Sequence, residues 1–173
     1  MSTTALPKEQ PGAGWLLRAA VRGDLSAVEG VLLAGVSPDA QDEDGDTPLL
    51  LAAAVGRSAI AELLLDAGAD ANLAGHDGLT PLMMASLSGH YAVAEVLIAR
   101  GARVDARDTV GRTALWFATL ASDLELARRL RVAGADPLLA DLEGWSPLDL
   151  AIEVGERPMI RLLSADRLVA ARL

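Results

Sequence analysis

Apolar residues recur along the chain in pairs of short helical patterns separated by polar segments. Within residues 45–77, two groups have the three- and four-residue spacing of a helix face: Leu49, Ala52 and Ala53, then Ile60, Leu63 and Leu64. We expect these two groups to form the core of a helix–turn–helix unit. One pair of helices cannot bury its apolar faces alone, so the pattern also predicts that several units stack.

A short motif repeats every 33 residues: Thr47-Pro48-Leu49, Thr80-Pro81-Leu82, Thr113-Ala114-Leu115 and Ser146-Pro147-Leu148. Upstream, WLLRAAVRGD at residues 15–24 matches PLLLAAAVGR at residues 48–57, which adds a fifth copy. The sequence therefore predicts a flexible N-terminus, residues 1–11, and one domain, residues 12–173, whose units span about 12–44, 45–77, 78–110, 111–143 and 144–173.

The residues around each motif suit the start and end of a helix. A Thr or Ser in front of the helix can cap it, and Pro fits the first turn, where its missing N–H would be unpaired anyway. Glycines recur two residues before the motif and again at Gly56, Gly89 and Gly155. We expect these glycines to take the positive φ angles of turns and helix ends.

This pattern resembles the ankyrin repeat family, whose unit is a β-turn and two antiparallel helices with a T-P-L-H-x-A signature. The resemblance covers about residues 12 to 166 and implies an all-α ankyrin-repeat solenoid of about five helix–turn–helix units linked by β-hairpin-like turns. The family's His is replaced here by Leu50, Met83, Trp116 and Asp149. The bond it makes between repeats is therefore replaced by packing or lost.

The unit at residues 111–143 departs furthest from the family pattern. It has Ala114 in place of Pro, Trp116-Phe117 in place of His-Leu, and Ser122 where the other units have the glycine that links the helices. Two interpretations stay open: a repacked layer, or a local change that shapes a partner site.

Composition limits the class of protein. Apolar residues make up 51% of the 173 residues, with only one Phe and one Tyr, which favours helices over strands. Absence of cysteine excludes disulfides and thiolate metal sites. We find neither a signal-peptide pattern nor an apolar run of membrane-spanning length, so we expect a cytoplasmic protein with no membrane partner. The Ala- and Arg-rich composition favours a bacterial source.

The net charge of −9 is unevenly distributed. Residues 1–86 hold four basic and twelve acidic residues, whereas residues 87–173 hold eleven and twelve. An acidic protein repels phosphate backbones, so we expect no nucleic-acid partner. A basic protein partner would be attracted to the N-terminal half, which leads to the hypothesis of an inhibitor or immunity-type protein that covers a basic active site.

The acidic segment 42–46, DEDGD, raises an alternative, a divalent-cation-responsive module. A calcium loop of the EF-hand type places glycine sixth and an acid twelfth. Counting from Asp42, glycine comes fourth and the twelfth residue is Ala53. The other units carry GHDGL, DTVGR and DLEGW at these positions, so the glycine belongs to the turn. We expect a solvated tip and no metal ligands, and we keep the cation module as the second hypothesis.

Resemblance to the family implies that the chain binds one protein, with the contacts lying on the tips of the turns and on the concave face of the first helices. The candidate residues on the tips are Glu43, Asp44, Asp46, His76, Asp77, Leu79, Arg107, Val110, Arg112, Leu142 and Trp145, and those on the helix face are Val55, Leu87 and Leu120. Trp and Arg often carry most of the binding energy, which favours Trp145, Arg107 and Arg112. The alternatives are packing of Trp145 on the adjacent hairpin, and pairing of the arginines with Asp105 or Asp108.

Catalytic and cofactor motifs do not occur in the sequence. The two histidines are His76, on a tip beside Asp77, and His90, where this family often has a structural His that opens the second helix. No nucleophile motif, phosphate-binding glycine loop or zinc motif is present. We therefore expect no enzyme activity and no cofactor, and we expect a monomer.

Overall fold

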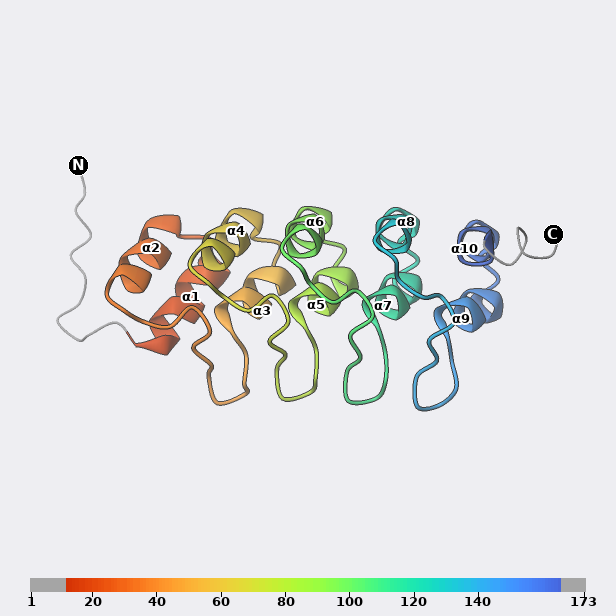
Figure 1. Cartoon of the computed structure of the whole chain (residues 1–173), viewed down its shortest axis with the longest axis horizontal. Helices are drawn as coiled ribbons and strands as arrows, with labels where there is room; N and C mark the ends of the chain where they lie inside the picture. Colours follow the sequence, from red (N-terminus) through yellow and green to blue (C-terminus); the bar gives the residue numbers. More distant parts are fainter. Residues whose placement is uncertain (1–11, 166–173) are drawn as a thin grey trace.

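The structure is a computed structural model that describes residues 12–165 (Figure 1). These residues form ten α-helices in five antiparallel pairs, in the order α1 Ala13–Arg22, α2 Leu25–Leu33, α3 Pro48–Ala54, α4 Ser58–Asp66, α5 Pro81–Leu87, α6 Tyr91–Ala99, α7 Ala114–Leu120, α8 Leu124–Val132, α9 Pro147–Val154 and α10 Arg157–Leu163. One pair lies within each predicted unit. The expected all-α solenoid is confirmed, whereas the flexible terminus predicted for residues 1–11 lies outside the described residues.

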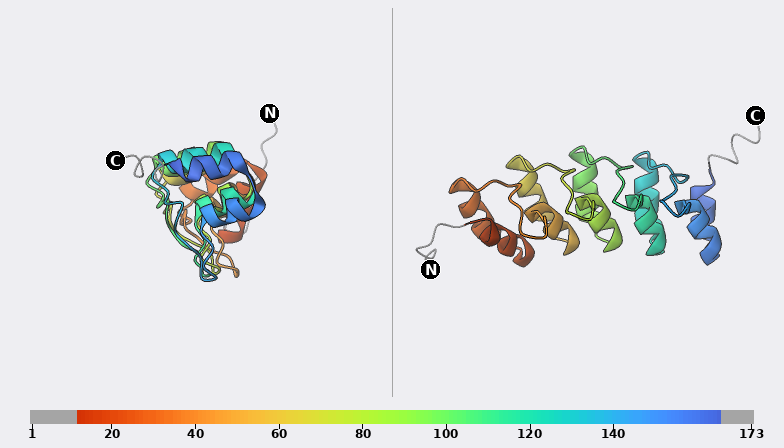
Figure 2. Two further views of the ribbon diagram at one scale, coloured as in Figure 1. Left: turned by 90° about the vertical axis from the view of Figure 1, so that its right-hand side faces the viewer. Right: turned by 90° about the horizontal axis from the view of Figure 1, so that it is seen from below.

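The helices form two layers. The first helix of each pair contacts the first helix of the next pair, from α1 through α3, α5 and α7 to α9. The second helices lie in the other layer, and the loops between pairs project past the first helices, on the side away from the second (Figure 1). The end-on view in Figure 2 shows the two layers with all projecting loops on one side. This arrangement places side chains from distant parts of the sequence in one row.

Hydroxyl caps begin four of the first helices, as the sequence predicts. Oγ1 of Thr47 accepts the amide hydrogen of Leu50 at 3.1 Å, and Thr80, Thr113 and Ser146 do the same in their units. The turn glycines have positive φ angles, and Ser122, where the other units have glycine, also lies in the left-handed region, at φ 57°. A residue with a side chain is strained in this conformation, so the turn after α7 is less stable than it would be with glycine.

The core runs without interruption through all five pairs. In the unit at residues 45–77, five of the six predicted core residues are buried, but Leu63 is only half-buried and Ala61 is fully buried. Leu63 lines a groove between α2 and α4. The helical spacing identified the correct face but not the edge of the core.

The position of the missing family histidine is filled mainly by packing. Leu50 and Met83 are buried there, and Asp149 accepts the amide hydrogen of Ser146 at 3.1 Å, which closes a capping box. Two of the bonds between units come from the residue before the second helix. The Nε of Arg57 donates to the carbonyl of Val21 at 3.1 Å, and Nε2 of His90 lies 3.2 Å from the carbonyl of Ala54.

Candidate protein-binding surface

Four tips project beside the first-helix layer. We define them as tip two, residues 41–46, tip three, 74–79, tip four, 107–112, and tip five, 140–145. In tips two, four and five the second residue is an aspartate: Asp42, Asp108 and Asp141. Oδ1 of each accepts the amide hydrogens of the residues two and four positions later, at 2.8–3.1 Å. These bonds fix the backbone of the tip, and they use none of its outer side chains.

Successive tips are bonded to one another. The amide nitrogen and Oγ1 of Thr109 both donate to the carbonyl of Asp77, at 3.1 and 2.8 Å, which joins tips three and four. The amide of Leu142 donates to the carbonyl of Val110 at 2.9 Å, which joins tips four and five. The ring of His76 packs over Gly45, where an added Cβ would lie 2.4 Å from the ring. The tips therefore form one connected row.

Most of the predicted tip residues reach solvent. Glu43, Asp44, His76, Asp77, Arg107, Val110, Leu142 and Trp145 are exposed, whereas Asp46, Leu79 and Arg112 are half-buried. Leu142 is the most exposed apolar side chain in the row, at 74%. Trp145 is 40% exposed, so the rest of the molecule covers only part of it.

Both arginines of tip four have partners within the fold. Arg112 pairs with Asp108, whose side chain is inaccessible to solvent; Nε and Nη2 of the arginine lie 2.8 and 2.7 Å from Oδ2 of the aspartate. The Nε of Arg107 donates to the carbonyl of Gly111 at 3.1 Å, and its Nη2 donates to the carbonyl of Ala140 in tip five. Asp105 pairs with neither arginine; it accepts the amide hydrogen of Asp136 at 3.0 Å. These contacts hold Arg107 and Arg112 against the scaffold.

Exposed apolar side chains follow the first helices. Val55, Leu87 and Leu120 are 39%, 43% and 49% exposed, and we call them the first-helix row. They lie at or next to the ends of α3, α5 and α7, three helices that pack side by side. Val21 and Val154 extend the row by one unit at each end. A single exposed leucine is ordinary, but an ordered row of apolar residues is typical of a contact surface.

The acids of tip two do not assemble into a metal site. Oδ1 of Asp42 is occupied by two backbone amides. Burial raises the pKa of Asp46, and the charges of Asp42, Asp77 and Asp44 raise it further. No group of three or more His, Asp or Glu side chains in the described residues could hold a metal ion. The cation hypothesis therefore finds no support in the geometry.

The residues that could take part in catalysis have structural contacts. His90 is bonded to the carbonyl of Ala54, and His76 packs on Gly45. The hydroxyl of Ser86 donates to the carbonyl of Leu82 at 2.7 Å.

No helix among residues 12–165 is long and apolar enough to cross a bilayer.

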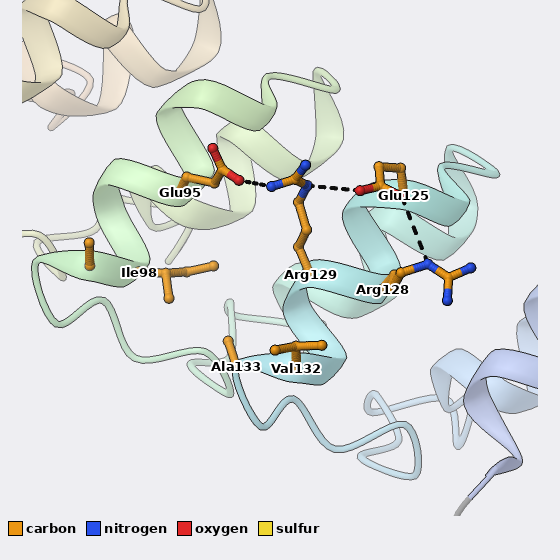
Figure 3. Close-up of a pocket in the computed structure, with 8 residues that line it drawn as sticks. Glu95, Ile98, Glu125, Arg128, Arg129, Val132 and Ala133 are labelled. Atoms are coloured by element: carbon orange, nitrogen blue, oxygen red, sulfur yellow. Dashed lines mark hydrogen bonds and ion pairs between the residues drawn. The ribbon is translucent and has the colours of Figure 1, made fainter.

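Grooves between neighbouring second helices were not anticipated from the sequence. The groove between α6 and α8 has a volume of about 520 Å³ and includes Ile98 and Val132 (Figure 3). Arg129 bridges the two helices, because it pairs with Glu95 on α6 and with Glu125 on its own helix, at 3.1 Å for the second pair. Leu33 and Val132 stand at the same position of the 33-residue period, with Asp66 and Ala99 at this position in the two units between, so their apolar side chains could have been noticed together.

Trp116 was assigned either to a repacked layer or to a partner site, and its contacts contain elements of both. The ring of Trp116 lies edge-on to Phe117, with 5.5 Å between the ring centroids. The guanidinium of Arg112 lies 5.3 Å from the centroid of the Trp116 ring. Trp116 also lines a pocket between tips four and five. Its Nε1 is buried and has no hydrogen-bond partner among the described residues.

Stacked helix pairs with one row of hydrogen-bonded tips define a solenoid repeat protein. A family model described as ankyrin repeats (3 copies) matches residues 16–108, which is more than half of the chain. The chain therefore belongs to the ankyrin repeat family. Ankyrin repeats are generally protein–protein interaction modules on a non-enzymatic fold, which implies a protein partner. A search of curated proteins gave no match to the chain.

Proposed function

We propose that this protein binds one partner protein through its tips and the first-helix row. The observation that carries the proposal is the hydrogen-bonded row of tips, which holds exposed apolar side chains such as Val110, Leu142 and Trp145 at fixed positions. A surface ordered before binding loses little conformational entropy when the partner docks.

The acidic N-terminal half favours a basic partner. Glu43 and Asp44 are exposed on tip two, and Asp77 is exposed on tip three next to them. Charges of one sign on neighbouring tips attract a basic surface and speed its association. A protein that covers a basic active site in this way would act as an inhibitor or immunity-type protein.

The first experiment is capture of the partner from cells that express the protein, followed by binding measurements with purified variants. Leu87→Arg places a charge in the first-helix row, and Trp145→Ala removes the aromatic side chain of tip five. We expect each to weaken binding by about tenfold or more, the loss typical of a central contact residue. Circular dichroism would verify that both variants fold.

The matched control is Leu33→Arg, the same substitution on α2, where the side chain is 89% exposed. It should leave the affinity unchanged. If the control loses as much affinity as the test variants, or if both test variants keep their affinity, the binding site lies away from the tips and the first helices.

A basic partner can be tested with salt. Raising the ionic strength from about 0.05 to 0.5 M shortens the reach of charge–charge attraction severalfold, so the association rate should fall by about tenfold or more. An association rate that does not change over this range would rule out electrostatic capture, although an uncharged partner could still use the same surface.

A further inference from the structure

Tips four and five enclose a pocket that none of the contacts described so far fills. Its volume is about 400 Å³. The lining residues are Val110, Arg112, Trp116, Asp141, Leu142 and Glu143. The chain therefore offers apolar side chains, two acids, one base and one indole within a space large enough for a single large side chain.

The charge of the pocket is negative. Arg112 is neutralised by Asp108, which is buried beneath it at 2.7 Å. Oδ1 of Asp141 accepts two amide hydrogens of the tip, but its Oδ2 accepts no hydrogen bond from the described residues. Glu143 is exposed, and none of the described residues donates to its carboxylate. Two acids thus remain available to a ligand.

One of the residues that line the pocket carries a hydrogen-bond donor without an acceptor. Nε1 of Trp116 is buried and unpartnered among the described residues, and a buried N–H without an acceptor destabilises the fold. The side chain of Trp116 lines the pocket, so a ligand bound there changes the surroundings of this indole.

We propose that the pocket receives a basic side chain of the partner protein, arginine in preference to lysine. The alkyl stem would lie against Val110 and Leu142, and the guanidinium would bind the free oxygens of Asp141 and Glu143. A planar guanidinium can donate to two carboxylates at once, which an ammonium does less well. This inference rests on the proposed function and adds to it the chemistry of one contact.

The test uses a small probe, N-acetyl-arginine N-methylamide, and the indole N–H signals of the three tryptophans in ¹⁵N-labelled protein. Trp15→Phe and Trp145→Phe assign two signals, and the third belongs to Trp116. We expect the Trp116 signal to shift with saturation, at a dissociation constant on the order of 1 mM for a ligand of this size. The corresponding citrulline compound has the same shape without the charge and should bind at least about fivefold more weakly, because it loses the charge-assisted bonds.

Glu143→Gln should weaken arginine binding at least about fivefold, for the same loss of a charge-assisted bond. The matched control is Asp44→Asn, the equivalent position in tip two, which removes the same charge away from the pocket and should change nothing. Equal binding of citrulline, tighter binding of N-acetyl-glutamate N-methylamide, or full binding by Glu143→Gln would each overturn the inference.

The outcomes separate this inference from the proposed function. If the probe leaves the Trp116 signal unshifted while Leu87→Arg still releases the partner, the basic-side-chain pocket is wrong and the binding surface stands. If the probe binds while Leu87→Arg and Trp145→Ala both retain the partner, the pocket chemistry stands and the proposed binding surface is wrong.

Discussion

Tips two and four share one hydrogen-bonded frame, although their sequences are QDEDGD and RDTVGR. In each, the first side chain donates to the carbonyl of the glycine, from Gln41 to Gly45 at 2.9 Å and from Arg107 to Gly111 at 3.1 Å. The aspartate that follows accepts two amide hydrogens in both tips. Different side chains therefore build the same turn, because a side-chain donor, a carboxylate and a glycine recur at the same three positions of both tips.

The two tips differ at their last residue, which is Asp46 in one and Arg112 in the other. Arg112 pairs with the frame aspartate, Asp108, whereas Asp46 faces Asp42, another acid, and its pKa is raised by burial and by repulsion from Asp42. The frame thus stabilises a cation at this position and destabilises an anion. An acid placed where it costs stability fits a role in binding, which is the role we propose for tip two.

The largest difference is expected when the frame aspartate is removed from each tip. Asp108→Ala should lower the free energy of unfolding by about 2–4 kcal/mol, because two amides lose their acceptor and Arg112 loses its partner. Asp42→Ala loses the same amide bonds but relieves repulsion on Asp46, so we expect about 1 kcal/mol. Urea unfolding of both variants measures the difference. Equal losses would mean that the buried ion pair adds nothing to tip four.

A smaller effect is expected from Arg112→Lys. The ammonium keeps the charge but loses the second bond to Asp108 and the stacking on Trp116 and Phe117, whose ring centroids lie 5.3 and 4.8 Å from the guanidinium. We expect a loss of about 1 kcal/mol in urea unfolding. Arg22→Lys, at an exposed position on α1, is the control and should be neutral. A neutral Arg112→Lys would show that charge alone holds tip four.

The smallest effect concerns the acid of tip two. Because the pKa of Asp46 is raised above its ordinary value of 3.8, folding favours the protonated carboxyl and penalises the charged one. Asp46→Asn should therefore stabilise the protein at pH 7, by less than about 0.5 kcal/mol, as is usual at a surface position. This gain should shrink as the pH falls through the raised pKa and vanish below about 3.8.

Thermal unfolding between pH 7 and pH 4 measures the Asp46→Asn gain, with Glu62→Gln on α4 as the control for a general charge effect. If the gain in stability stays constant over this range, or if the control shows the same gain, the charged carboxylate of Asp46 does not destabilise the fold.

The fold could be predicted from the sequence because its determinants repeat every 33 residues. Thr47 shows this well: its position marked a helix cap from the sequence alone, and its Oγ1 does accept the amide hydrogen of Leu50. Such bonds are local, so the residue types within one unit suffice to predict them. The partial exposure of Leu63, which was predicted as a core residue, was missed because it depends on how closely α2 and α4 approach each other.

The candidate surface was only partly predictable, because contacts between tips depend on two units at once. The sequence offered Asp105 and Asp108 equally as partners for the arginines of tip four; the structure pairs Arg112 with Asp108 and directs Arg107 to the carbonyl of Ala140, in the next tip. The unpaired indole of Trp116 and the pocket beside it likewise arise from neighbouring tips. The sequence repeat alone does not show which side chains of neighbouring tips meet.

The close approach between tips limits how this protein can change. A Cβ added to Gly78 would lie 2.8 Å from the amide nitrogen of Thr109, and one added to Gly111 would lie 3.2 Å from Cα of Asp141. An extra residue in tip four or tip five would pull its amide away from the carbonyl that it meets in the preceding tip. New recognition properties should therefore arise by exchanging side chains at constant loop length, and a library for redirecting this scaffold should vary residue identity and leave insertions out.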